Sequence, residues 1–146
     1  MKTSTRLRIA AALATVQGVA HGALLLLAKP RHGAAELAVI DAMKSHRFDF
    51  SGATRSYWDF YLGYGIEAAA VCLIEAVLLI QLSRIADARA ELVRPLLLLI
   101  ALANLAHIIL IARYFFYLPA IFDLLIAACV VWAYASSEPA QSLAPQ

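Results

Sequence analysis

Four long apolar runs, each long enough to cross a membrane, constrain this chain more than any other feature. A helix needs about 20 mostly apolar residues to cross a hydrocarbon core about 30 Å thick. Helices are the expected form, because an open strand edge cannot satisfy its backbone groups in lipid. The sequence therefore predicts an all-α integral membrane four-helix bundle, forming one domain over residues 1–146. The expected spans are residues 9–28, 57–82, 95–113 and 117–135.

Composition supports a membrane protein rather than a soluble one. Hydrophobic residues make up 63% of the chain and charged residues 15%, against about 45–50% and about 25% in soluble domains. The net charge of +2 is too mild for a nucleic-acid partner, and the expected partner is the lipid bilayer. Cys72 and Cys129 lie inside apolar runs without a nearby ligand cluster, so no metal site is predicted.

The connections between the runs also carry information. Residues 31–56 form a long first loop, in which apolar residues recur at helical spacing and predict a short amphipathic helix on the membrane surface. The third connection is very short, which predicts a tight antiparallel hairpin of the last two helices. Pro95 is expected in the first turn of its span, where its missing N–H does no harm. Residues 136–146 are predicted to be a flexible tail.

Orientation is weakly specified by charge. With the N-terminus inside, six Lys and Arg residues lie on each side of the membrane. The first helix usually dominates the choice, and three basic residues precede it: Lys2, Arg6 and Arg8. We therefore expect a cytoplasmic N-terminus.

One ionisable residue in each run lies at a similar depth. Counting helical rise from the outer end of each run places His21, Glu67, His107 and Asp123 about 8–10 Å deep. Ionisable groups inside a span are costly and mark functional sites. These four residues are the predicted catalytic group. Glu75 lies nearer the opposite end of its run and is predicted to lie away from them.

Further polar, aromatic and small residues surround this level. Gln17 and Asn104 fall on the same helical faces as His21 and His107, respectively. Aromatic residues at the start of the second run suit an interfacial belt, and glycine allows a ligand to approach closely. The predicted ligand-binding residues are Gln17, Tyr57, Trp58, Asp59, Tyr61, Gly63 and Asn104.

Three functions fit this pattern. The first is an intramembrane pocket for a lipophilic small molecule, with acid/base chemistry of an isomerase or cyclase type, since His beside carboxylates can transfer protons near neutral pH. The second is a non-enzymatic structural or accessory role, in which the polar groups hold the helices together. The third is a b-type haem protein with His21 and His107 as axial ligands. No cofactor is favoured over an empty pocket.

Two runs of residues resemble a known signature. Ser45–Phe50 reads SHRFDF and Tyr57–Gly65 reads YWDFYLGYG. Together with Gly18–Gly22 they resemble a family of small bacterial four-span membrane proteins. The resemblance implies four spans in a bacterial inner membrane and directs attention to the first loop and the second span, without implying an activity.

A second likeness is architectural. A long aromatic loop before the second span, a carboxylate within that span and a His in the third span are similar to the sterol-isomerase and sigma-2-receptor group. Here the last two features correspond to Glu67 and His107. This likeness implies a lipophilic pocket and, as an analogy of architecture, does not establish a reaction.

Overall fold

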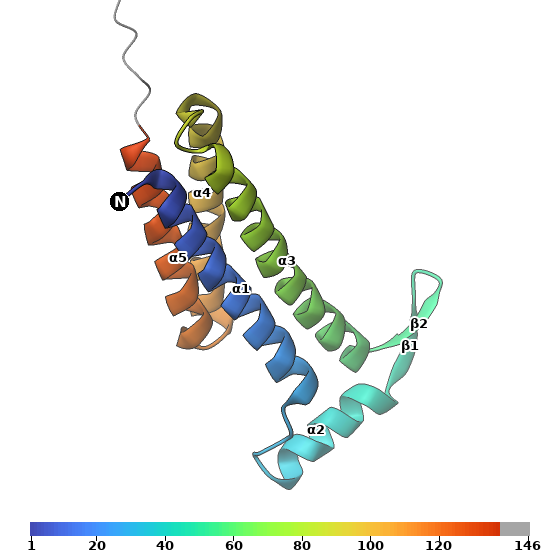
Figure 1. The fold of residues 1–146 in the computed structure, drawn as a ribbon. Helices are drawn as coiled ribbons and strands as arrows, with labels where there is room; N and C mark the ends of the chain where they lie inside the picture. The colour runs from blue at the N-terminus through green and yellow to red at the C-terminus, as the bar shows by residue number, and fades with distance from the viewer. Residues whose placement is uncertain (138–146) are drawn as a thin grey trace, which may run out of the picture. The chain divides into compact units, whose positions relative to one another are not determined.

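The computed structural model describes residues 1–137, which contain five helices and one two-stranded hairpin (Figure 1). Four helices are long and apolar enough to cross a membrane. These observations confirm an all-α membrane protein. Most of the expected flexible tail, residues 138–146, lies outside the described residues. The elements are α1 (Thr3–Leu27), α2 (Ala34–Ser45), β1 (Arg47–Phe50), β2 (Ala53–Ser56), α3 (Tyr57–Ile85), α4 (Ala90–Tyr114) and α5 (Tyr117–Ser136).

The spanning helices extend beyond the apolar runs. α1 begins at Thr3 rather than near residue 9, and α4 begins at Ala90 rather than at residue 95. Pro95 consequently lies inside α4 and not in its first turn, so this expectation was wrong. The physical reason is that polar residues such as Glu91 can continue a helix into the headgroup layer, where hydropathy no longer marks its end.

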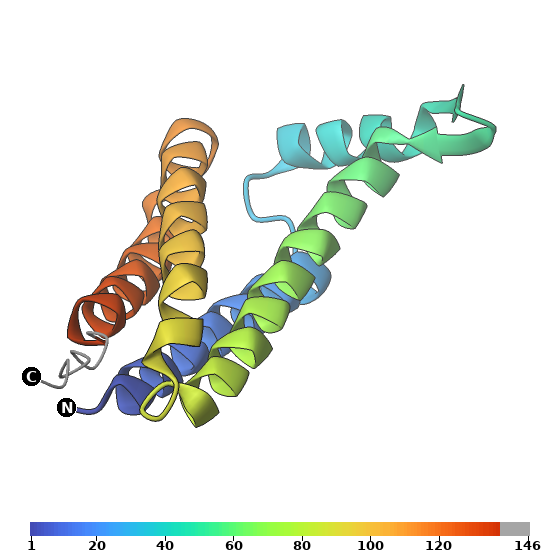
Figure 2. The same ribbon diagram turned by 90° about the horizontal axis from the view of Figure 1, so that it is seen from above.

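The chain divides into two compact units. The first comprises residues 1–17 and 72–137, and the second comprises residues 18–71. In the first unit α4 and α5 lie side by side as an antiparallel hairpin, joined only by Phe115 and Phe116 (Figures 1 and 2). This confirms the tight hairpin expected from the short third connection.

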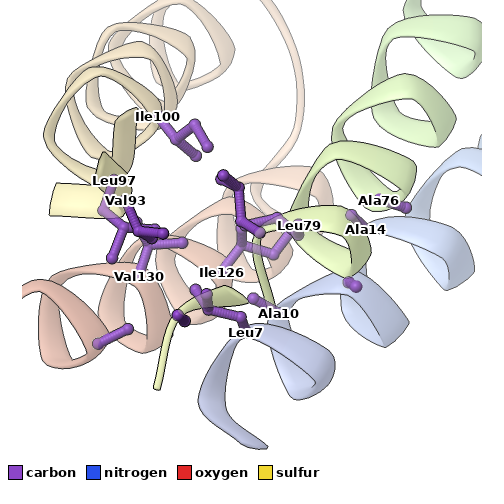
Figure 3. Close-up of a cluster of buried hydrophobic side chains, with 14 residues drawn as sticks. Leu7, Ala10, Ala14, Ala76, Leu79, Val93, Leu97, Ile100, Ile126 and Val130 are labelled. Carbon is purple, nitrogen blue, oxygen red and sulfur yellow. The ribbon is translucent and has the colours of Figure 1, made fainter. Parts of the chain in front are cut away.

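The first unit has a hydrophobic core to which all four spanning helices contribute (Figure 3). α1 presents Leu7 and three alanines, Ala10, Ala11 and Ala14, and small residues of this kind let neighbouring helices approach closely. Leu79, Leu97, Ile126 and Val130 are fully buried. The labelled residues of this core are Leu7, Ala10, Ala14, Ala76, Leu79, Val93, Leu97, Ile100, Ile126 and Val130.

Two arginines hold the C-terminal end of α5. Nη1 of Arg6 in α1 donates to the carbonyl oxygen of Trp132 at 3.3 Å, and Nη1 of Arg94 in α4 donates to those of Tyr134 and Ser137 at 3.2 and 2.6 Å. Each guanidinium also lies over an aromatic ring of α5. The last carbonyls of a helix lack intrahelical donors, and cations are favourable there. These contacts tie α1 and α4 to the end of α5.

The N-terminus of α1 is stabilised by a carboxylate. The carboxylate of Asp87, in the α3–α4 connection, accepts hydrogen bonds from the backbone N–H of Ser4, at 3.1 Å, and from its hydroxyl. An acid near a helix N-terminus satisfies a free N–H and interacts favourably with the helix dipole. Asp87 therefore anchors α1 to the α3–α4 connection.

The first loop folds as a helix followed by a hairpin. α2 confirms the short helix expected there, and none of its residues is buried. Strands β1 and β2 pair antiparallel with Phe50 opposite Ala53, around a two-residue turn of Ser51 and Gly52. Both turn residues have positive φ, 49° and 83°, as a type I′ hairpin turn requires. The sequence analysis did not predict this hairpin, which Figure 2 shows after α2.

In the second unit, α1 and α3 approach closely through glycines. A Cβ atom built on Gly22 would lie 3.6 Å from the Cβ of Ala69. One built on Gly65 would lie 2.5 Å from Cδ2 of Leu25, which is too close for any real contact. Small residues at a helix interface let backbones approach in lipid, and a side chain at residue 65 would require the end of the Leu25 side chain to move.

Candidate functional site

A histidine and a carboxylate predicted to act together are in contact in the first unit. Nδ1 of His107 on α4 lies 3.1 Å from Oδ2 of Asp123 on α5. The Asp123 side chain is buried, whereas 47% of the His107 side chain is exposed. Oδ2 accepts no well-aligned hydrogen bond from the described residues, so the imidazole is its closest polar partner. The tight α4–α5 hairpin brings the two helices together and places this pair.

The second oxygen of Asp123 is held by α1. Nε2 of Gln17 donates to Oδ1 of Asp123 at 2.9 Å, and both side chains are buried. The amide of Gln17, which was predicted as a ligand-binding residue on the face of His21, is hydrogen-bonded to this carboxylate. Its contact with a ligand stays a prediction. Three helices thus contribute to one polar contact: α1 through Gln17, α4 through His107 and α5 through Asp123.

Glu75 belongs to the same unit and not to a remote region. Nδ2 of Asn104 donates to Oε1 of Glu75 at 2.6 Å, and also to the carbonyl of Ile100 at 3.0 Å. Asn104 lies one helical turn from His107. The expectation that Glu75 lies away from the polar residues was therefore wrong.

The error came from counting depths from opposite ends of the spans. The depth of Glu75 was counted from the inner end of its run, whereas the depths of the predicted catalytic residues were counted from the outer ends. Counted from the inner end, Glu75 lies 7 residues from residue 82 (82 − 75) and Asn104 lies 9 residues from residue 95 (104 − 95), about 10 and 14 Å deep. The two residues are therefore at similar levels.

The other two predicted catalytic residues, His21 and Glu67, belong to the second unit. His21 on α1 is partly buried, and its Nε2 has no hydrogen-bond partner among residues 1–137. Glu67 on α3 is exposed. The structure thus brings His107 and Asp123 together. The grouping of all four residues, like the His21–His107 pairing of the haem hypothesis, stays a prediction.

Glu67 lines a hollow of about 380 Å³ on one side of α3. Three of the residues predicted as functional recur four apart along the helix: Asp59, Gly63 and Glu67. This spacing places them on one helical face. The remaining lining residues, which the sequence analysis did not select, are Arg55, Phe60 and Tyr64. Phe60 and Tyr64 show the same spacing of four, so the signal was present in the sequence.

Asp59, which lines this hollow, also caps the N-terminus of α3. Its Oδ2 accepts from the backbone N–H of Ser56 at 2.8 Å, and the hydroxyl of Ser56 accepts from the backbone N–H of Asp59 at 3.2 Å. This reciprocal pattern is a capping box. It explains why α3 begins abruptly after β2, and it leaves the other carboxylate oxygen of Asp59 available to the hollow.

The two signature runs meet in one aromatic cluster. The ring of Phe48 on β1 lies 5.0 Å from that of Tyr57 and 6.1 Å from that of Phe60, both on α3. Phe50 meets Phe60 edge-on at 5.5 Å. Aromatic pairs in these geometries are favourable beyond simple burial. Aromatic residues of the first run therefore fix the hairpin to aromatic residues of the second run at the start of α3.

The remaining predicted aromatic residues make other contacts. Trp58 lies beneath the ammonium of Lys44 at 4.6 Å and beside Tyr61 at 5.3 Å. Tyr57 stacks on His46. Tyr57 and Trp58 thus connect α3 to the end of α2, and Tyr61 packs on Trp58. Their position at the start of α3 suits an interfacial belt.

The geometry of His107 and Asp123 determines the chemistry that this pair can perform. A buried carboxylate beside Nδ1 fixes the orientation of an imidazole and leaves Nε2 to exchange a proton.

Among residues 1–137, no group of three or more His, Cys, Asp or Glu side chains is arranged to hold a metal ion. In comparisons with known proteins, no protein-family model, no curated protein and no solved structure matches the chain.

Proposed function

We propose that the protein binds a lipophilic small molecule within the membrane, and that His107 and Asp123 transfer a proton to or from it. The observation that carries this proposal is the contrast in exposure within one contact. The carboxylate of Asp123 is buried and fixed by Gln17, while the His107 ring, 3.1 Å away, is half exposed. A ligand can reach the imidazole without displacing the carboxylate.

The roles of the two residues differ. Nε2 of His107 accepts a proton from the ligand or returns one to it, and Asp123 stabilises the imidazolium that forms in between. Asp123 does not itself take the proton. Substrates suited to this chemistry are lipophilic molecules that isomerise, cyclise or open an epoxide by proton transfer. Participation of His21 and Glu67 remains part of the hypothesis.

The test compares what the purified protein retains from the membrane. Wild-type protein in detergent is extracted with organic solvent, and the extract is analysed by mass spectrometry beside those of His107→Gln and Asp123→Asn. His32→Gln, in the exposed connection before α2, is the matched control. We expect a species present with the wild type and the control and depleted with both site variants. Equal extracts from all four proteins would contradict the proposal.

Proton transfer needs a separate measurement. The imidazole reagent diethyl pyrocarbonate should modify the half-exposed ring of His107, and Asp123→Asn should change the rate because the ring loses its orienting carboxylate. Incubation of the wild type in heavy water should also introduce deuterium into the retained species, and His107→Gln should not. A retained species that never acquires deuterium would restrict the protein to binding.

A structural role is the second candidate, and the hydrogen bonds of Gln17 to Asp123 and of Asn104 to Glu75 favour it. Such contacts can join helices in lipid by about 0.6 kcal/mol on average. If this is their whole purpose, His107→Gln lowers thermal stability while the extracted species are unchanged. The extract comparison and a melting curve on the same samples separate the two functions.

We also propose that the protein resides in a bacterial inner membrane with its N-terminus in the cytoplasm. Three basic residues at the start of α1 or just before it, and the resemblance of the two signature runs, support this placement. A membrane-impermeant maleimide should label Ser45→Cys on α2 in intact cells. It should not label Ala88→Cys in the α3–α4 connection. The opposite labelling pattern would reverse the orientation.

A further inference from the structure

Glu67 is a carboxylate in an unusual position. It lies 10 residues into the spanning helix α3 (67 − 57), and within the second unit its exposed side chain has no hydrogen-bond or ion-pair partner. Ionisable groups within a spanning segment are costly unless they are paired or reach water. The hollow of about 380 Å³ beside it is where a partner can be received.

The charges around this hollow are mixed and separated. Arg55 lies at its β2 end, while Asp59 and Glu67 are spaced along α3. No ion pair joins Arg55 to either carboxylate within the second unit. Nη1 of Arg55 donates to the carbonyl of Thr54, and Oδ2 of Asp59 accepts from the Ser56 N–H. The remaining atoms of the guanidinium and of the two carboxylates can receive a ligand, and one that carries an anionic and a cationic group matches them best.

Aromatic rings form part of the lining. Phe60 and Tyr64 have ring centroids 6.3 Å apart in a stacked arrangement, and Tyr64 is 69% exposed. The face of an aromatic ring attracts cations, most strongly where water is excluded. These rings favour an ammonium group beside the carboxylates, and they would disfavour a second anion.

The level of the hollow indicates a lipid headgroup rather than a ligand deep in the hydrocarbon. Trp58 and Tyr61 are the kinds of residue enriched at the interface, and they lie on the same turns of α3 as Asp59. From Asp59 to Glu67 the helix rises about 12 Å over eight residues (67 − 59). The hollow therefore extends from the interfacial layer into the upper hydrocarbon.

We infer that this hollow binds the headgroup of a zwitterionic phospholipid with a primary amine. The guanidinium of Arg55 binds the phosphate, as arginine commonly does. The ammonium lies between Asp59 and Glu67, against Phe60 and Tyr64. A primary ammonium offers three N–H donors to the carboxylates, which a choline group lacks. This inference does not depend on the His107–Asp123 pair.

Gly63 provides a precise means of blocking the site. A Cβ atom at this position meets nothing within 4 Å, so Gly63→Leu fills the hollow without disturbing the packing of the helix. Ala70→Leu is the matched control. It lies seven residues further on the same face of α3, is exposed, and does not line the hollow. Glu67→Gln removes the charge that the ammonium requires.

The experiment is native mass spectrometry of the purified full-length protein with equal amounts of phosphatidylethanolamine, phosphatidylcholine and phosphatidylglycerol. We expect the ethanolamine lipid to bind best. Gly63→Leu and Glu67→Gln should weaken it about tenfold, which is the effect of losing a charged hydrogen bond, and Ala70→Leu should leave it unchanged. Circular dichroism of each variant should show an unchanged helix content.

Several results would overturn the inference. Binding of the ethanolamine lipid that is equal in the wild type and Gly63→Leu would show that the hollow is not the site. A preference for phosphatidylglycerol would show that the carboxylates do not select the ligand. Binding of free phosphoethanolamine in the absence of any lipid preference would assign the site to a soluble amine instead of a membrane lipid.

Discussion

The amide of Asn104 donates to the carboxylate of Glu75 at 2.6 Å, joining α4 to α3 inside the first unit. The same amide nitrogen also donates to the carbonyl of Ile100 one turn earlier, so one buried side chain serves both its own helix and its neighbour. If Asn104 is replaced, the Glu75 carboxyl inside the span has no side-chain donor. The contribution of the pair to the free energy of unfolding can therefore be measured.

Replacing Asn104 alone should lower the free energy of unfolding more than replacing both Asn104 and Glu75. Asn104→Leu leaves the Glu75 carboxyl unpaired and should lower the free energy of unfolding by about 1–2 kcal/mol. The Asn104→Leu, Glu75→Leu double variant should recover part of this loss, because no polar group is then left unsatisfied. Unfolding in mixed micelles, followed by circular dichroism, measures both. Strictly additive losses would show that the two side chains are not coupled.

Gly65 and Gly63 form a natural comparison, because they lie two residues apart on the same helix. In Gly65→Ala the new methyl group would lie 2.5 Å from Cδ2 of Leu25, and overpacking of this kind costs about 1–3 kcal/mol. Gly63→Ala meets nothing and should gain up to about 1 kcal/mol of helix propensity. Thermal unfolding of the two variants should shift in opposite directions.

The Leu25 contact can be tested directly. In a Leu25→Ala background the side chain that obstructs residue 65 is shortened, so Gly65→Ala should become much less costly. If Gly65→Ala is equally harmful in both backgrounds, the close approach of α1 and α3 is not the cause.

The Ser4–Asp87 contact should make stability depend on pH in the acid range. The pKa of Asp87 lies below its ordinary value of 3.8, chiefly because the Ser4 hydroxyl donates a hydrogen bond to the carboxylate. A lowered pKa means that the carboxylate stabilises the folded state above pH 3.8 and that this contribution is lost as the pH falls through the folded-state pKa. Asp87→Asn should therefore be less stable than the wild type at neutral pH.

The measurement is thermal unfolding at about pH 7 and about pH 3. The difference between the wild type and Asp87→Asn should shrink at the lower pH. Asp41→Asn on α2, an exposed carboxylate, is the control and should follow the wild type. A difference that stays constant over the range would mean that Asp87 contributes through the shape of the connection and not through its charge.

Arg94 should be one of the most sensitive basic residues outside the candidate site. Arg94→Gln removes the donor to the carbonyl of Ser137 and one of three donors to the carbonyl of Tyr134, which also accepts from the backbone N–H and the hydroxyl of Ser137. It should lower the free energy of unfolding by about 1 kcal/mol. Arg94→Lys should restore only part of this, because an ammonium lacks the planar fork of a guanidinium. Arg84→Gln, exposed in the last turn of α3, should be nearly neutral in the same unfolding assay.

Hydropathy and loop length were sufficient to predict four spanning helices, the surface helix α2 and the α4–α5 hairpin. They were insufficient at helix ends, because residues such as Glu91 are polar and still helical. The β-hairpin was missed because its strands have only four residues each and its turn, Ser51-Gly52, is a weaker signal than Asn-Gly.

Within the candidate site, the contact of His107 with Asp123 followed from their matched depth on adjacent helices. The role of Gln17 did not, because spacing along α1 relates it to His21 and says nothing about a partner on α5. Glu75 was misplaced because its depth was counted from one end of the spans and the depths of the other polar residues from the opposite end. Arg55 was passed over because its place beside α3 depends on the unpredicted hairpin.

The two guanidinium groups on the end of α5 have a consequence for biosynthesis. Arg6 is synthesised long before its acceptor, the carbonyl of Trp132, which lies 126 residues later. Until α5 has been inserted, the Arg6 guanidinium, which is buried in the folded protein, lacks this acceptor. We therefore expect this contact to form only after α5 has been made, and chains that stop before Trp132 to be substrates for membrane proteolysis rather than stable three-helix fragments.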